Sequence, residues 1–239
     1  MKQVTKRELP LIVELSGRAG SGKSTLRRAV MKKLNERGCE TYEELWVGTG
    51  KDMVWVFRFL FRYPFRAAKG IYFILRNRKD WKIKRILQDI GMMGLVYGKI
   101  RRAEAFGGAS IIDEGVSRRL PGSVQCLSIY PLERIDLIMA YIYSHSEARW
   151  ERLVNRYKEG KPGHLGYHKE DPSSPRLKDE HVEFWRGHKH GTSLPQTVHL
   201  IVLDNSKSEA LEPNRDQIIG IINEVAPSAE RFLFMHGRS

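Results

Sequence analysis

The chain has 239 residues, 41% hydrophobic and 29% charged, a balance typical of a globular protein with a substantial core. Glycine (21) and proline (10) are near average, which excludes a collagen-like or mainly disordered chain. No apolar run reaches about 18 residues, so we expect no membrane-spanning helix, and the basic N-terminus leads into too few apolar residues for a signal peptide. Cys39 and Cys126 offer no disulfide framework, and we expect a cytoplasmic protein.

The positive charge is concentrated in one segment. Lys and Arg number 41 against 28 Asp and Glu, a net charge of +13. Residues 51–105 alone hold 14 basic and four acidic residues, which is +10 of that total. Such a block suits a polyanion, a phosphorylated ligand or an anionic membrane surface, and the alternative is a solvated basic face.

The first half of the chain predicts two strands and a long helical segment. Residues 11–15 are a short apolar run typical of a buried strand, and 24–37 have helical spacing that ends at Gly38. Residues 39–45 predict a second strand. We interpret 53–105 as mostly helical, with Pro64 opening a new turn, although the alternating aromatic residues of 55–65 are strand-like.

The second half alternates strands with helices. Residues 110–113 and 135–143 predict strands, and 146–157 predict a helix. Residues 159–195 are polar and predict a long loop with one helical piece near 179–185. Residues 197–203 then predict a last strand and 216–225 a last helix. This alternation predicts a parallel α/β sheet.

A glycine-rich motif joins the first strand to the first helix. It reads Gly17-Arg18-Ala19-Gly20-Ser21-Gly22-Lys23-Ser24, which fits G-x-x-x-x-G-K-[ST], the P-loop or Walker A pattern, and Thr25 follows. Glycines let backbone N–H groups turn around a phosphate, and the positive end of the next helix faces the anion. We therefore expect ATP here, with Lys23 on the β- and γ-phosphates and the Ser24 hydroxyl on Mg²⁺.

An acidic pair and an arginine stripe are candidates for the chemistry. Asp113 closes a predicted strand, where a carboxylate can hold Mg²⁺ or accept a proton from an attacking hydroxyl, and Glu114 can share either role. A turn or helix-capping acid is the alternative. Arg149, Arg152 and Arg156 share one helix face and suit the charge of a transferring phosphoryl group, although they also suit an ordinary charged face.

These residues resemble the P-loop nucleoside and nucleotide kinases, and thymidylate kinase most closely. The resemblance rests on the P-loop, on Asp113 after an apolar strand, on residues 136–148 followed by Arg152-x-x-x-Arg156, and on the strand end at 202–204. It implies a P-loop NTPase fold in one domain, 1–239. The fold would be a five-stranded parallel sheet flanked by helices, with a basic acceptor-side helical insert (51–105) and an arginine helix with a lid (145–195).

The chain departs from that family where the acceptor would bind. Thymidylate kinases have an arginine after the strand-end acid, and this chain has Glu114. Arg118 and Arg119 follow and are the candidates to replace it in substrate binding. A carboxylate beside Asp113 repels a phosphate dianion and favours a hydroxyl acceptor.

Several interpretations stay open at this point. The leading one is a kinase acting on a hydroxyl of a glycan intermediate or a polynucleotide. The alternatives are a nucleoside monophosphate kinase and a nucleotide-dependent ATPase that remodels a partner. The aromatic residues of 55–73 suit core packing, base stacking or a membrane surface, and a homodimer is compatible with the sequence. The histidines of 164–190 lack the spacing of a zinc site.

Overall fold

The computed structural model describes residues 10–39, 41–44, 53–76, 82–106, 109–113, 128–160, 173, 182–183 and 197–225. Its strands are β1 (Leu11–Ser16), β2 (Thr41–Glu44), β3 (Ala109–Asp113), β4 (Asp136–Tyr143) and β5 (Val198–Asp204). Its helices are α1 (Lys23–Glu36), α2 (Met53–Arg62), α3 (Pro64–Arg76), α4 (Ile83–Phe106), α5 (Ser146–Lys158) and α7 (Leu211–Val225), with short 3₁₀ turns η4 (Leu132–Arg134) and η7 (Ser208–Ala210).

The strands form one parallel sheet in the order β2-β3-β1-β4-β5. The predicted parallel α/β sheet flanked by helices is therefore confirmed. Four strands form its body, while the strand expected over 39–45 is the four-residue edge strand β2, in which only the Thr41 side chain is described. Because all pairs are parallel, the carboxyl ends of β1, β3, β4 and β5 lie at one edge, where ligands bind in such sheets.

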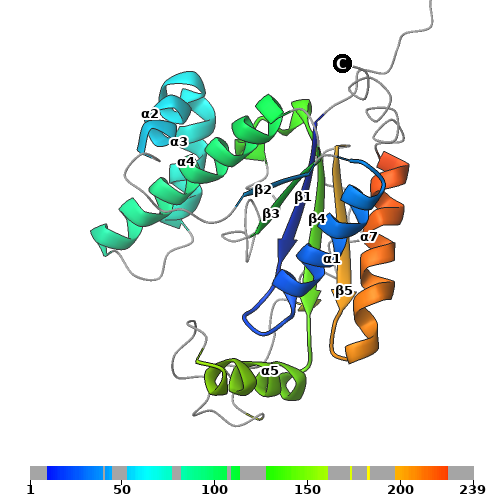
Figure 1. Ribbon diagram of the computed structural model, residues 1–239. Coiled ribbons are helices and arrows are strands. Elements are labelled where there is room, and N and C mark those ends of the chain that lie inside the picture. Colours follow the sequence, from blue (N-terminus) through cyan, green and yellow to red (C-terminus); the bar gives the residue numbers. More distant parts are fainter. Residues whose placement is uncertain are drawn as a thin grey trace, which may run out of the picture.

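Helices cover both faces of the sheet (Figure 1). On one face α1 and α7 pack against alternate strand residues such as Val13, Ile138 and Ile201. On the other face α4 packs against the intervening residues such as Ile12 and Met139, and α2 and α3 lie beyond α4. The strands thus have two buried faces, which explains their nearly continuous apolar sequences.

The ambiguous aromatic segment is helical. Pro64 is the first residue of α3, as predicted, and the aromatic residues of α2 divide between a buried and an exposed face. A Cβ on Gly94 of α4 would lie 2.5 Å from the Cα of Val56, and one on Gly98 would lie 2.7 Å from the Trp55 ring. Glycine at these two positions therefore lets α2 approach α4 closely.

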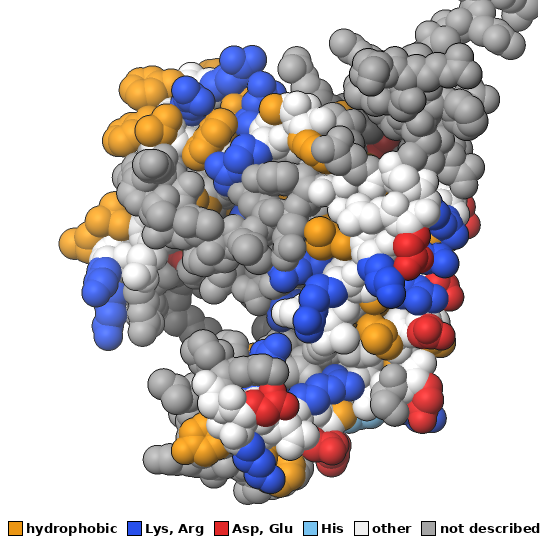
Figure 2. Space-filling view, in the orientation of Figure 1, with side chains coloured by type: hydrophobic (Ala, Val, Ile, Leu, Met, Phe, Trp, Pro, Cys, Tyr) orange, Lys and Arg blue, Asp and Glu red, His pale blue; other side chains and the backbone are white. Residues whose placement is uncertain are grey.

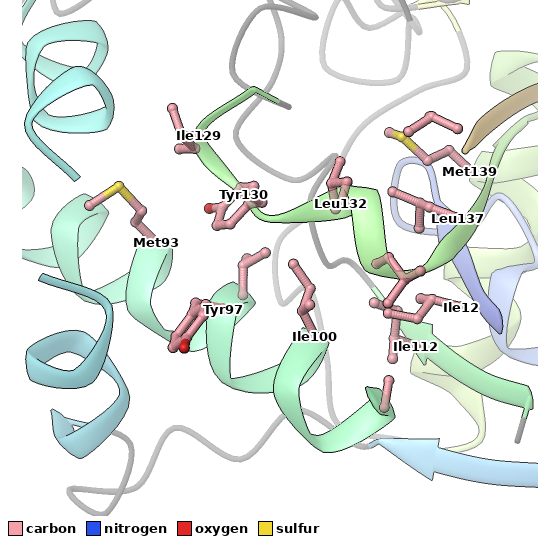
Figure 3. Packing of buried hydrophobic residues seen from close by; sticks show 14 of the residues in the cluster. Ile12, Met93, Tyr97, Ile100, Ile112, Ile129, Tyr130, Leu132, Leu137 and Met139 are labelled. Carbon is pink, nitrogen blue, oxygen red and sulfur yellow. The ribbon is translucent and has the colours of Figure 1, made fainter. Parts of the chain in front are cut away.

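The core on this side of the sheet links the helical layer to the strands. Figure 3 shows Met93, Tyr97 and Ile100 of α4 between the neighbouring helices, a connecting segment with Tyr130 and Leu132, and sheet residues such as Ile12 and Ile112. The Phe59 ring of α2 lies 5.0 Å from that of Tyr97 and 6.0 Å from that of Tyr130. The helical segment is therefore packed onto the sheet. No helix in the described part of the chain is long and apolar enough to cross a membrane.

Candidate active site

The glycine-rich motif forms the loop between β1 and α1. Its backbone is left-handed at Gly17 (φ 140°), Gly20 (φ 79°) and Gly22 (φ 90°), a region that other residues rarely adopt. A Cβ on Gly17 would lie 2.1 Å from the carbonyl oxygen of Ile142, and one on Gly22 would lie 2.2 Å from Nδ2 of Asn205. Conformation and space therefore both require glycine, and the loop is pressed against the ends of β4 and β5.

Two arginines of α5 hold the outer side of this loop. Arg149 is fully buried, and its Nε donates to the carbonyl of Ala19 at 3.1 Å. Arg152 donates from Nη1 to the carbonyl of Gly20 at 3.2 Å. Since the C=O and N–H of a trans peptide point in opposite directions, the peptide held by Arg149 directs the N–H of Gly20 to the other side of the loop.

The next carbonyl of the loop is held in the same way. The carbonyl of Ser21 accepts a hydrogen bond from Nδ2 of Asn205 at 2.8 Å, and the Ser144 hydroxyl, which donates to the carbonyl of Asn205 at 2.8 Å, lies 3.4 Å from it. Ser144 follows β4 and Asn205 follows β5, so both strand ends contribute. The N–H of Gly22 is thereby directed away from these partners, while the N–H of Ser21 closes a turn onto the carbonyl of Arg18 at 3.1 Å.

The loop leads directly into the positive end of a helix. Helix α1 begins at Lys23, Gly22 provides no side-chain cap, and the first turn contains no acidic residue. The first N–H groups of a helix have no partner within it, so this end can receive an anion. The Lys23 ammonium donates to the carbonyls of Gly17 and Arg18, the latter at 3.3 Å, which holds its charge against the loop.

Arg152 connects the loop to both strand ends. It also donates to the Ser144 hydroxyl at 3.0 Å and to the carbonyl of Asn205 at 2.6 Å. Burial lowers the pKa of Arg152, and the neighbouring charge of Glu151 opposes that shift. A guanidinium still stays protonated at neutral pH, so a fixed positive charge lies beside the loop.

The predicted site residues are brought together only in part. Arg149 and Arg152 contact the loop backbone, and Arg156 is exposed further along α5. The backbone of Asp113 pairs with Leu15, which places Asp113 at the same edge of the sheet as the loop. The Asp113 side chain, together with Glu114, Arg118 and Arg119, lies outside the described part, as does most of the expected lid. Their roles stay predictions, as does a contact of Arg149 or Arg152 with the transferring phosphate.

In the sequence, the ends of β4 and β5 entered only as part of a resemblance, and the side chains there were given no role in the site. Besides Ser144 and Asn205, the Asp204 carboxylate accepts hydrogen bonds from the Tyr143 hydroxyl at 2.9 Å and from the Ser206 N–H at 2.9 Å. Burial by itself raises the pKa of Asp204, but the bonds from Ser206 and Tyr143 and the charge of His145 bring it below its ordinary value. The signal that could have found them is position, because polar residues at the ends of parallel strands meet at one edge.

A second polar group was also missed, inside the sheet. Glu14 of β1 is fully buried and pairs with Ile112 of β3 and Met139 of β4. Because paired residues lie on the same face of a sheet, Glu14 lies on the face covered by α4. Ser110 lies on that face too, and Lys99 of α4 is buried. Buried charges need partners, and Glu14 and Lys99 each have one.

No protein-family model matches the chain, and no curated protein matches it. Among solved structures, a sugar kinase from Janibacter sp. HTCC2649 is 16% identical with a TM-score of 0.43, covering 92% of this chain and 97% of that chain. A thymidylate kinase from Ehrlichia chaffeensis is 12% identical with a TM-score of 0.42, covering 89% and 98%. Both similar proteins are kinases, but likenesses this weak decide neither the family nor the reaction.

Proposed function

We propose that the chain is an ATP-dependent phosphotransferase of the thymidylate-kinase-like type that acts on a hydroxyl of its acceptor. The observation that carries this proposal is the loop between β1 and α1. The carbonyls of Ala19, Gly20 and Ser21 accept hydrogen bonds from residues outside the loop. Its glycines have no Cβ that would obstruct a ligand, and it leads to Lys23 and a helix whose N-terminus has no side-chain cap. Such a cradle binds a phosphate chain through backbone N–H groups and one lysine.

Magnesium fits the oxygen donors at this edge. Ser24 lies in the first turn of α1, and Asp113 closes the strand beside β1. Hydroxyl and carboxylate oxygens are the ligands that Mg²⁺ takes from proteins in phosphate sites, usually with waters. Bound there, the ion would neutralise charge on the nucleotide phosphates.

The remaining roles follow from charge and position. Lys23 would bear on the β- and γ-phosphates, and Arg156, exposed on α5, would reach the transferring group. Asp113, with Glu114, would accept the proton of the attacking hydroxyl, which then takes the γ-phosphoryl group while ADP leaves. Arg118 and Arg119 would bind the acceptor. Glu114 disfavours a phosphate acceptor, so a hydroxyl of an anionic glycan intermediate is the first choice and a polynucleotide end the second.

The phosphate-loop assignment is tested by replacing Lys23. Lys23→Ala should lower phosphoryl transfer by about 10³-fold or more with little change in folding, because its ammonium acts on phosphate charge. The matched control is Lys32→Ala, an exposed lysine of the same helix whose change should leave activity unaltered. Transfer by Lys23→Ala within about tenfold of the parent would exclude the assignment.

The acceptor is tested by a screen with radiolabelled ATP. Glycan intermediates, polynucleotides, nucleosides and nucleoside monophosphates are offered in parallel, and label transfer is measured. Efficient transfer to a monophosphate, near about 10⁵ M⁻¹ s⁻¹, would identify a nucleoside monophosphate kinase and overturn the hydroxyl assignment. Rapid ATP hydrolysis that no acceptor accelerates would instead identify an ATPase.

A further inference from the structure

Helix α2 is apolar on two opposite faces. Val56 and Phe59 are buried against α4, whereas Val54, Phe57 and Phe61 are exposed. The three exposed residues are spaced by three and four positions, so they form one stripe along the helix. Large apolar side chains gathered on an exposed face commonly mark a contact surface. The outer stripe of α2 therefore has the composition of a surface that contacts something else.

Helix α3 continues this surface. Phe65 is 90% exposed and Phe61 is 83% exposed, on either side of the short connection between the two helices. Tyr72 is exposed seven residues after Phe65, on the same face of α3, while Ala67 and Gly70 face the core. We call the five exposed residues the outer aromatic face: Val54, Phe57, Phe61, Phe65 and Tyr72.

The outer aromatic face lies among basic side chains. Residues 53–76 contain five arginines and lysines and no acidic residue. Arg58 and Arg76 are exposed, Arg58 lies over the Trp55 ring at 5.0 Å, and Arg66 pairs with Glu133 at 3.1 Å. Figure 2 shows orange hydrophobic and blue basic side chains gathered over this part of the molecule, at the upper left.

We propose that the outer aromatic face is a docking surface for an anionic phospholipid bilayer. The phenylalanines would enter the boundary between headgroups and acyl chains, and Arg58, Arg62 and Arg76 would lie at the level of the lipid phosphates. Exposed aromatic residues flanked by arginine and lysine are the pattern of helices that lie in the membrane interface. The inference does not rest on the phosphotransferase proposal, because binding requires neither nucleotide nor acceptor.

Charge decides between a bilayer and a second copy of the chain. In a two-fold symmetric dimer the same patch meets itself, so the basic residues of 53–76 would face identical basic residues with no acidic partner among them. An anionic lipid surface complements that charge. A polynucleotide would also complement it, but its bases need a groove or platform for stacking, whereas these phenylalanines stand out on convex helices.

Vesicle flotation tests the proposal on the full chain without nucleotide. The parent should bind vesicles containing about 30% phosphatidylserine and bind pure phosphatidylcholine vesicles at least about tenfold more weakly. Raising NaCl from about 0.1 to 0.5 M should weaken that binding, because salt screens the basic residues. No binding to the anionic vesicles, or equal binding to both kinds, would overturn the proposal without touching the phosphotransferase assignment.

Variants locate the contact. Phe61→Ser with Phe65→Ser should reduce vesicle affinity by about tenfold or more, since both side chains would leave the acyl boundary. Arg58→Glu should give a similar loss, and salt should weaken the remaining binding less steeply than it weakens that of the parent. The matched controls are Tyr157→Ser, a half-exposed aromatic on α5, and Lys32→Glu on α1, which should bind like the parent. If the double variant bound anionic vesicles as tightly as the parent, Phe61 and Phe65 would not form the membrane contact.

Two further measurements distinguish the other occupants. Sedimentation of the lipid-free parent should show a monomer. A dimer that dissociates in the variant with Phe61→Ser and Phe65→Ser would instead assign the outer aromatic face to a second copy of the chain. Binding of a single-stranded oligonucleotide that the double variant abolishes would assign it to nucleic acid. The binding of the parent to the two kinds of vesicle, and its dependence on salt, are measured without any variant. These measurements therefore test the proposal even where a substitution disturbs folding.

Discussion

Arg152 connects the glycine-rich loop to the ends of β4 and β5. Its guanidinium contacts the carbonyls of Gly20 and Asn205 and the hydroxyl of Ser144, so it joins three segments that are far apart in sequence. Removing it takes this donor from the carbonyl of Gly20 and leaves the carbonyl of Asn205 with only the Ser144 hydroxyl, at 2.8 Å; a buried group left unsatisfied costs about 1–3 kcal/mol. The positive charge beside the loop is lost at the same time.

We therefore expect Arg152→Ala to lower both the free energy of unfolding and the affinity for ATP, the latter by about tenfold. Urea denaturation and calorimetric titration with ATP measure the two effects. Lys158→Ala is the control on the same helix, and because Lys158 is exposed and has no role in the proposed site it should keep both quantities near those of the parent. ATP affinity unchanged in Arg152→Ala would show that the loop does not need this support.

Asp204 carries the clearest pH dependence in this region. Hydrogen bonds lower its pKa in the folded protein below the ordinary value near 4, so the carboxylate contributes stability above that pH. The contribution is lost as the pH falls through the folded pKa. Asp204→Asn should thus be less stable than the parent at pH 7, by less than about 1 kcal/mol because the residue is exposed.

The Asp204→Asn difference should shrink as the pH falls below about 4. Denaturation curves at several pH values measure it, with Glu209→Gln in the adjoining turn as the control. If the difference in the free energy of unfolding between parent and Asp204→Asn stayed constant from pH 7 down to the lowest pH measured, the hydrogen bonds of Asp204 and not its charge would account for the stabilisation.

At the scale of elements, the loop between β1 and α1 leaves no room for a Cβ at Gly17 or Gly22. Gly17→Ala should place a methyl group against the backbone of Ile142 in a strained conformation, so we expect a loss of at least about 2–3 kcal/mol in the free energy of unfolding. Gly220→Ala is the matched control, because this glycine lies within α7 with nothing near its added Cβ.

Gly220→Ala should instead stabilise the protein by up to about 1 kcal/mol, since alanine favours the helix. Urea denaturation of both variants provides the comparison. A Gly17→Ala protein as stable as the parent would show that the loop adopts another conformation. The same glycine-to-alanine change is expected to lower the free energy of unfolding at Gly17 and to raise it at Gly220. A general effect of an added methyl group would change both in the same direction.

At the scale of the whole molecule, the two helical layers share one sheet. Neighbouring residues of β1 alternate between them, with Ile12 in the core under α4 and Val13 in the core under α1 and α7. Loss of either layer would expose the other face of the same strands. We therefore expect one cooperative unfolding transition, in agreement with the single domain predicted from the sequence.

Scanning calorimetry should give one transition whose calorimetric and van't Hoff enthalpies agree. Phe59→Ala, which weakens the outer helical layer, should shift that whole transition to lower temperature, while the exposed Phe61→Ala should not. Two separate transitions, with only one sensitive to Phe59→Ala, would indicate that the helical layer folds apart from the sheet.

Local patterns in the sequence were enough for the phosphate loop and for the alternation of strands with helices. The motif consists of glycines, Lys23 and Ser24 within eight consecutive positions, so a short stretch of sequence is enough to recognise it. The aromatic segment could not be assigned in this way, because alternating residues 55–65 fit a strand as well as a helix. In the structure this segment is helical and packs against α4 at Gly94 and Gly98.

The arginine stripe of α5 was visible in the sequence, but its contacts were not. Arg149 lies 130 positions from its partner Ala19, and Asn205 lies 184 positions from its partner Ser21. Those contacts exist because β4 pairs with β1, and β5 with β4, which brings three strand ends to one edge. The sequence by itself therefore determined which residues form the loop that we propose binds phosphate, and only the tertiary structure decided which residues hold that loop in shape, since that choice depends on pairing between distant strands.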